Sequence, residues 1–306
     1  MIKIAVAGIG GVGGYFGGRL ARHYHTSDEV EVYFIARGEN ETAIRQHGLK
    51  VETPGSTFTA YPKLVTSNSS LIGEVDYLIC STKSYDLEQS ITQLKPCIGK
   101  NTIILPLLNG IDSYERIKSI YPKNEVWEGC VYIVSRLTEP GLVTVTGENN
   151  ALFFGSTNGT SARLDEALRI FTDAGINATL SQNIQQTIWE KYLFISTIAT
   201  LTSYLDTSIG GILAKPENME LLYALLAEFK QVAKAKGIVF SENSLSAITD
   251  RMGKLPYETT SSMHTDYQKG KATEVDSLTG YIVKLGKQLN IPTPTYEKLY
   301  TELKNK

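Results

Sequence analysis

The sequence has 306 residues, more than one hydrophobic core usually serves, so we expect about two domains. Thirty basic and 32 acidic side chains give a net charge of −2, which argues against a nucleic-acid-binding protein and against attraction to an anionic membrane. Three cysteines without a CxxC pair argue against a disulfide framework, and no apolar run reaches the roughly 18 residues of a membrane span; we therefore expect a cytoplasmic protein.

The chain begins with an apolar strand at residues 2–7 that leads directly into a GxGxxG motif. In this pattern Gly8 permits a tight turn, Gly10 lets a pyrophosphate approach the main chain, and Gly13 lets the following helix pack closely on the strand. The unpaired N–H groups of the helix N-terminus would then face the phosphates. The position of the motif predicts a dinucleotide site; the alternative is a glycine-rich turn that binds nothing. The motif is Gly8-Ile9-Gly10-Gly11-Val12-Gly13.

Strands and helices alternate in the first half of the chain, which predicts a parallel sheet with right-handed crossovers. Each expected strand is short, apolar and bounded by Gly, Pro, Ser or Asn. The expected strands are 2–7, 30–36, 77–81 and 102–105, and helices include 15–25, 41–48 and 85–94.

Residues 126–155 are rich in β-forming residues, and we expect an antiparallel extension of the same sheet there. Its strands are predicted at 131–137, 142–146 and 151–155, with a turn at Pro140-Gly141 and a polar separator at 147–150.

The second half is predicted to be helical, so the fold class is α/β: a Rossmann-type domain at residues 1–180 and an all-α domain at 181–306. The polar stretch 177–186 marks the boundary. The segment 188–204 is mostly apolar and carries one lysine, which is typical of a central helix packed on several sides. The other helices are predicted at 162–174, 217–236, 241–252, 270–289 and 295–304.

The end of the second strand bears on the choice of dinucleotide. An NAD site usually has an acidic residue there, whereas this strand ends in Arg37-Gly38. A guanidinium can pair with a 2′-phosphate, so the sequence favours NADP(H). The alternative is that Arg37 is a surface charge and Glu39 supplies the acid.

Several polar residues end or interrupt apolar segments. Lys83 and Asn109 follow predicted parallel strands at their carboxyl ends, where open α/β sheets bind ligands, although either residue could belong to an ordinary turn. Lys191 interrupts the apolar helix; burial of an amine lowers its pKa and makes it a usable general acid. The alternative is a lysine that reaches the surface or pairs with Glu190.

Glu274 lies at the head of a predicted helix, where a carboxylate is also favoured by the helix dipole. Ser261-Ser262 could cap a helix or donate hydrogen bonds to a ligand. None of the four histidines has a partner at metal-ligand spacing, so we expect no metal site, and the absence of GxSxG leaves nucleophilic hydrolysis unsupported.

These motifs, in this order and spacing, resemble the ketopantoate reductases (2-dehydropantoate 2-reductases), the NADPH-dependent enzymes of pantothenate and coenzyme A synthesis. The similarity runs nearly end to end. Besides the glycine motif, the matching segments are Ala36-Arg37-Gly38, Ser81-Thr82-Lys83, Leu107-Leu108-Asn109-Gly110, Pro140-Gly141 followed by Gly155, Trp189-Glu190-Lys191, Ser261-Ser262-Met263 and Thr273-Glu274-Val275-Asp276.

The resemblance implies a Rossmann-type domain and a helical domain with the active site in the cleft between them. It implies that Lys191 donates a proton to the C2 carbonyl oxygen of a 2-oxo acid and that Glu274 organises the site at the nicotinamide ribose and the substrate. The remaining roles implied are the adenosine ribose phosphate region for Arg37 and Lys83, the nicotinamide and substrate for Asn109, another cofactor contact for Ser135, and a substrate contact for Ser262.

One departure concerns the substrate. In the family, asparagines one and two turns beyond the lysine usually line the substrate cleft, and Ile195 and Ala199 stand at these positions here. Three functions therefore stay open: ketopantoate reduction, NADPH-dependent reduction of another 2-oxo acid, and an NADPH-binding sensor without catalysis. The apolar helices of the second half could bury a homodimer interface or each other.

Overall fold

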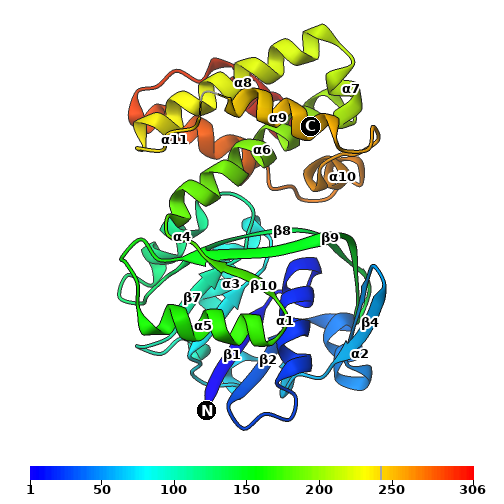
Figure 1. Cartoon of the computed structure of the whole chain (residues 1–306), viewed down its shortest axis with the longest axis vertical. Coiled ribbons are helices and arrows are strands. Elements are labelled where there is room, and N and C mark those ends of the chain that lie inside the picture. Colours follow the sequence, from blue (N-terminus) through cyan, green and yellow to red (C-terminus); the bar gives the residue numbers. More distant parts are fainter. Residues whose placement is uncertain (242) are drawn as a thin grey trace. The chain divides into compact units, whose positions relative to one another are not determined.

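The computed structural model describes residues 1–241 and 243–306, and contacts within the chain divide it into two units (Figure 1). Unit 1 comprises Met1–Leu108 and Ser113–Ile184, and unit 2 comprises Asn109–Asp112 and Gln185–Lys306. The short segment Asn109–Asp112 thus belongs with the helices although unit 1 flanks it in the sequence. Glu242, part of the helix predicted at 241–252, lies outside the described residues.

The first sheet of unit 1 is fully parallel, with the strand order β5-β2-β1-β6-β7. The four strands predicted from alternation are confirmed, because their apolar runs are buried in the sheet. The weakly patterned β5 at the edge was not predicted. The strands are β1 (Ile2–Ala7), β2 (Val30–Ile35), β5 (Leu64–Thr66), β6 (Tyr77–Cys80) and β7 (Ile103–Pro106).

The second sheet of unit 1 corrects one expectation. The long antiparallel hairpin of β8 (Glu128–Glu139) and β9 (Leu142–Gly155) does not continue the first sheet; β9 pairs in parallel with β3 (Leu49–Thr53) and β10 (Asn177–Leu180). The turn at Pro140-Gly141 is confirmed, and Gly141 has a φ of +78°. The predicted separator 147–150 lies inside β9, opposite a register shift in β8. β4 (Ser56–Ala60) completes the sheet beside β3.

The helix α1 (Gly11–His23) contacts strands of both sheets, which explains its many glycines. A Cβ on Gly14 would lie 2.5 Å from a methyl carbon of Val143 in the second sheet, and one on Gly17 would lie 3.2 Å from Val6 in the first. Small residues therefore let α1 fit between the two layers. The other helices of unit 1 are α2 (Gly38–His47), α3 (Leu87–Gln93), α4 (Ser113–Ile120) and α5 (Ala162–Asp173).

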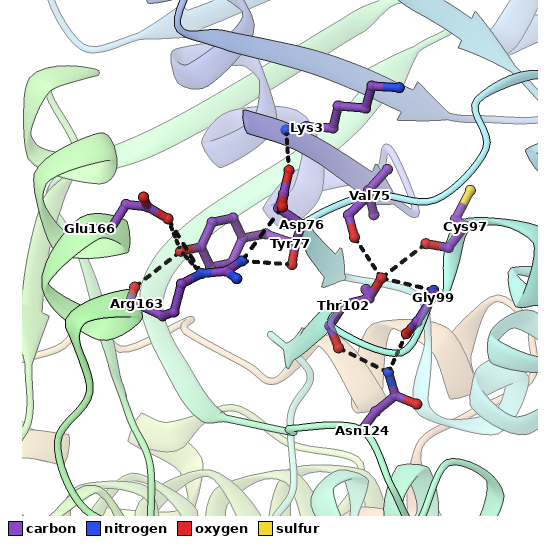
Figure 2. Close-up of polar contacts among 10 residues, drawn as sticks. All are labelled: Lys3, Val75, Asp76, Tyr77, Cys97, Gly99, Thr102, Asn124, Arg163 and Glu166. Atoms are coloured by element: carbon purple, nitrogen blue, oxygen red, sulfur yellow. Dashed lines mark hydrogen bonds and ion pairs between the residues drawn. The ribbon is translucent and has the colours of Figure 1, made fainter. Parts of the chain in front are cut away.

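Polar networks hold the amino ends of the central strands (Figure 2). The Tyr77 hydroxyl donates to Glu166 and accepts from Arg163 Nε at 2.9 Å, while Asp76 accepts from the Lys3 main-chain N–H at 2.8 Å. Burial raises the pKa of Tyr77, with a further contribution from the Glu166 hydrogen bond. The opposite, carboxyl edge of the sheet carries the predicted ligand residues. A second network joins Val75, Cys97, Gly99, Thr102 and Asn124.

Unit 2 is helical and is organised around α6 (Ile184–Leu205), whose middle turns are almost entirely buried, as predicted for a central helix. The helix predicted at 270–289 begins later, with a π-helical turn at Asp276–Gly280 that leads into α11 (Tyr281–Leu289). Among the described residues, no helix has the length and hydropathy to traverse a lipid bilayer. The remaining helices are α7 (Ile209–Leu213), α8 (Pro216–Ala235), α9 (Ser244–Gly253), α10 (Ser262–Gln268) and α12 (Pro294–Lys304).

Candidate functional site

The glycine motif lies in unit 1 between the end of β1 and the start of α1. Gly8 has a φ of +87°, and a Cβ there would lie 2.7 Å from the Ser81 carbonyl group at the end of β6. A Cβ on Gly10 would meet no described atom within 4 Å. Packing within the chain therefore requires glycine at position 8, whereas the space beside Gly10 is open to a ligand.

A residue that the sequence did not reveal, Asn40 in α2, fixes the glycine motif. Its side-chain amide donates to the Ile9 carbonyl at 2.8 Å, and its carbonyl accepts from the Gly141 N–H at 2.8 Å. Asn40 thus ties the glycine loop to the β8–β9 turn. No local sequence pattern predicts this role, because the two hydrogen-bond partners of Asn40 lie 31 and 101 residues away in the sequence.

A groove of about 340 Å³ runs from Gly8 and Gly10 past the ends of β2 and β6. Arg37 and Lys83 line it with exposed side chains. The hydroxyls of Ser81, Thr82 and Ser90 are buried in its lining and have no hydrogen-bond partner among the described residues. Buried polar groups normally find partners, so these hydroxyls indicate a place for a polar ligand.

Ser135, on β8, lies against the motif from another side. A Cβ on Gly11 would clash with the Ser135 main-chain carbonyl and lie 2.8 Å from its Oγ. That Oγ is also buried without a hydrogen-bond partner in the described part of the chain. The helix N-terminus, the open space at Gly10, these hydroxyls and the two cations together fit a dinucleotide.

In unit 2, the predicted acid Lys191 is buried on α6, with 7% of its surface exposed. Its Nζ donates to Asn109 Oδ1 at 3.1 Å. The alternative in which this lysine extends to the surface is therefore wrong. Asn109 is not an ordinary turn residue either, because its side chain meets the buried amine within unit 2.

Glu274 is also buried, with 5% exposed, and immediately precedes the helical residues that lead into the π-helical turn. Two main-chain carbonyls of this turn accept hydrogen bonds from α6, one from the residue after Lys191 and one from a residue about one turn further along. The Tyr192 hydroxyl donates to the Ser277 carbonyl at 2.8 Å, and Ser196 Oγ donates to the Leu278 carbonyl at 2.7 Å. Isolated π-helical turns are frequent at functional sites.

The segment Asn109–Asp112 is held by the same turn. Ser277 Oγ donates to Asp112 Oδ2 at 3.1 Å. Gly110 has a φ of +96°, which lets the chain turn sharply between Asn109 and Asp112. Three elements (the Asn109–Asp112 segment, α6 and the π-helical turn) thus fix the positions of Asn109, Lys191 and Glu274. Neither Asp112 nor Ser277 was predicted.

Ser262 is exposed at the first residue of α10. The preceding Ser261 caps this helix by accepting from the His264 N–H at 3.0 Å, and its Oγ lies 2.8 Å from Thr202 Oγ1 on α6. Thr202 follows Lys191 by eleven residues, or about 16 Å along the helix axis. Ser262 therefore lies near the far end of an α6 face that begins at Lys191.

Comparisons with known proteins cover both units. Residues 4–159 match the family described as "Ketopantoate reductase PanE/ApbA", and residues 183–306 match the family described as "Ketopantoate reductase PanE/ApbA C terminal". The crystal structure of a 2-dehydropantoate 2-reductase from Porphyromonas gingivalis W83 is 38% identical, with a TM-score of 0.86 and 99% of each chain covered. This similarity confirms the predicted fold class.

Two further relatives extend the range of functions. An uncharacterized oxidoreductase, YkpB, from Bacillus subtilis (strain 168) is 30% identical over 99% of this chain and 98% of its own. A D-mandelate dehydrogenase, solved in a ternary structure with NADH and anilino(oxo)acetate, is 26% identical, with a TM-score of 0.86 and coverage of 99% of this chain and 98% of its own.

Proposed function

The chain belongs to the ketopantoate reductase PanE/ApbA family, and we propose that it reduces 2-dehydropantoate to pantoate with NADPH in pantothenate and coenzyme A biosynthesis. The coarser assignment follows from the family: an oxidoreductase that acts on a small-molecule keto acid. The observation that carries the proposal is the buried Lys191 amine held by Asn109. We place the reaction in the cytoplasm.

In the proposed reaction, three side chains of unit 2 have distinct roles. NADPH, when bound, supplies a hydride to C2 of the 2-oxo acid, and negative charge develops on the former ketone oxygen. Lys191 stabilises this charge and donates a proton to the oxygen. Asn109 accepts one hydrogen bond from the ammonium and so orients it. Glu274 organises the nicotinamide ribose and the substrate.

Support for NADPH comes from the groove in unit 1. Arg37 follows β2 and lines the groove, whereas Glu39 is not among the described residues that line it. A guanidinium at this position suits the 2′-phosphate of NADPH. Lys83 supplies a second cation; we assign the pyrophosphate to the glycine motif and a further cofactor contact to Ser135. Because the related D-mandelate dehydrogenase was solved with NADH, the choice between NADH and NADPH has to be measured for this chain.

A second candidate function, reduction of another 2-oxo acid, is favoured by Ile195 and Ala199 on the Lys191 face of α6. The sensor hypothesis has less support, since cofactor binding alone requires no buried proton donor.

The test is NADPH oxidation, followed at 340 nm, with 2-dehydropantoate and related 2-oxo acids. We expect Lys191→Ala to lower kcat by about 10²–10⁴-fold, because general-acid catalysis is lost. The Kd for NADPH should stay near the wild-type value. Lys298→Ala, an exposed lysine on α12, is the matched control and should keep full activity. Near-normal turnover by Lys191→Ala would reject the proposed role.

A further inference from the structure

The face of α6 between Lys191 and Thr202 is apolar. Residues spaced by three, four, seven and eleven positions lie on one side of a helix, which places Phe194, Ile195 and Ile198 between the two polar ends. From position 191 to position 203, Phe194 and Ile195 are the partly exposed side chains, and the others are buried. A ligand beside Lys191 on this face of α6 would therefore meet hydrocarbon at Phe194 and Ile195.

The four hydroxyl groups between positions 196 and 202 of α6 are engaged inside unit 2. Each makes a hydrogen bond to a main-chain carbonyl or to another buried hydroxyl, and each side chain is fully buried. They offer no donor to a ligand on the open face. The bonds are Ser196 to Leu278 (2.7 Å), Thr197 to Leu193 (2.8 Å), Thr200 with Thr279 (2.8 Å) and Thr202 to Ile198 (2.8 Å).

Phe194 is already covered by a charged group. The guanidinium carbon of Arg251, on α9, lies 4.2 Å from the centre of the Phe194 ring. Such stacking suits a planar cation on an aromatic face. Ile195, one turn from Lys191, is the other partly exposed apolar side chain on this face of α6.

We propose that this enzyme also takes 2-oxo acids whose substituent on C2 is wholly apolar, and that the C4 hydroxyl of 2-dehydropantoate adds less than about tenfold to kcat/KM. This inference rests on the proposed function and specifies its substrate class. A site built to hydrogen-bond a substrate hydroxyl rejects the analogue without it by about 10⁴–10⁵-fold, whereas a hydrophobic site separates the two weakly. Ile195 makes this site a hydrophobic one.

The experiment compares 2-dehydropantoate with 3,3-dimethyl-2-oxobutanoate, which differs only by loss of the hydroxyl. We expect the wild-type enzyme to favour the hydroxylated acid by less than about tenfold, or to favour the other acid. A larger preference for 2-dehydropantoate would overturn the inference and would point to a donor such as Arg251.

Two variants at one position test the role of Ile195. Ile195→Asn should raise the relative kcat/KM for 2-dehydropantoate by about tenfold or more, because an amide can pair with the hydroxyl. Ile195→Leu, the apolar control, should leave the ratio unchanged. An unchanged ratio in Ile195→Asn, with a normal melting curve, would show that this side chain does not face the substrate.

Binding of the two product acids separates failure of the inference from failure of the proposed function. If neither oxo acid is reduced, the proposed function is wrong. Calorimetry with NADP⁺, pantoate and 2-hydroxy-3,3-dimethylbutanoate still decides the inference. Dissociation constants within about tenfold support it, and a stronger preference for pantoate, or no binding of either acid, overturns it.

Discussion

At the scale of single residues, the glycine motif contains glycines of two kinds. Packing within the chain requires glycine at position 11, because a Cβ there would clash with the Ser135 carbonyl. Gly10 faces open space, and its φ of −98° is accessible to alanine. A ligand beside position 10 would account for the glycine there.

This difference predicts opposite effects of the same substitution at neighbouring positions. Gly11→Ala should lower the free energy of unfolding by about 1–3 kcal/mol, the usual cost of overpacking. Gly10→Ala should leave stability unchanged or raise it by up to about 1 kcal/mol, because alanine restricts the unfolded chain. Urea unfolding measures both values.

Binding gives the other half of the comparison. Gly10→Ala should weaken NADPH binding by at least about tenfold, since the new methyl group occupies the approach of the pyrophosphate. Fluorescence titration with NADPH measures this change. Wild-type affinity in Gly10→Ala would mean that the open space beside this glycine is not the phosphate site.

Sequence patterns indicated some site residues and not others, for physical reasons. Lys191 stands out because a charge inside an apolar helix is costly, and Lys83 and Arg37 because they end buried strands. Asn40, Asp112 and Ser277 act through hydrogen bonds to residues far away in the sequence, so nothing in their neighbourhood identifies them.

At the scale of elements, α12 shows how a terminal helix is fastened to unit 2. The buried carboxylate of Glu228, on α8, accepts from the N–H groups of Thr295 and Tyr296 at 2.8 and 3.0 Å and so caps the first turn of α12. The Tyr296 hydroxyl lies 3.1 Å from Ser196 Oγ on α6. Two helices thus hold α12 through buried polar groups.

Burial raises the pKa of Tyr296 to about 12, and this shift predicts how stability depends on pH. Above pH 10 the unfolded chain loses this proton while the folded chain keeps it, so the folded state binds more protons. The contribution is complete below pH 10 and is lost as the pH rises toward 12. Between these values the free energy of unfolding should fall by about 1.4 kcal/mol per pH unit from this group.

Tyr296→Phe isolates that contribution. At pH 8 it should cost about 1 kcal/mol for the lost hydrogen bonds, and it should flatten the slope between pH 10 and 12 by about 1.4 kcal/mol per unit. Tyr223→Phe, at an exposed tyrosine on α8, is the control and should change neither value. An unaltered slope in Tyr296→Phe would contradict the assignment.

Elements with a strong hydrophobic pattern were predictable, and elements without one were not. The segment around α6 and the strands β1, β2, β6 and β7 have strong hydrophobic patterns. The strands β3, β4 and β5 are short and partly exposed, and β10 lies in a polar stretch, so their pairing decides their structure. The second sheet exists because β9 pairs with β3, about 90 residues earlier in the chain, a contact that alternation alone does not reveal.

At the scale of the whole molecule, the two units have separate hydrophobic cores, and each core contains one of the two tryptophans. Trp127 is fully buried in unit 1, and Trp189 has 2% exposed in unit 2. The predicted domains 1–180 and 181–306 do not assign Asn109–Asp112 to the helical unit, because four residues that join another core carry no pattern of their own. The variant Trp189→Phe keeps Trp127 as a fluorescent reporter of unit 1, and the variant Trp127→Phe keeps Trp189 as a reporter of unit 2.

These reporters allow a test of the groove in unit 1 that does not involve catalysis. Adenosine 2′,5′-bisphosphate, the adenosine half of NADP, should bind unit 1 through Arg37 and Lys83. At about 100 times its Kd it should raise the stability reported by Trp127 by about 2.7 kcal/mol. The transition reported by Trp189 should move less, because the lining residues of this groove belong to unit 1.

The 2′-phosphate is the decisive group in this comparison. AMP at the same concentration should give a much smaller shift, since a charge-assisted hydrogen bond contributes about 1.5–3 kcal/mol. Arg37→Gln should remove the difference between the two nucleotides, and Arg45→Gln, an exposed arginine on α2, should preserve it. Equal shifts with AMP and the bisphosphate in the wild-type chain would show that Arg37 is a surface charge and that the preference for NADP is wrong.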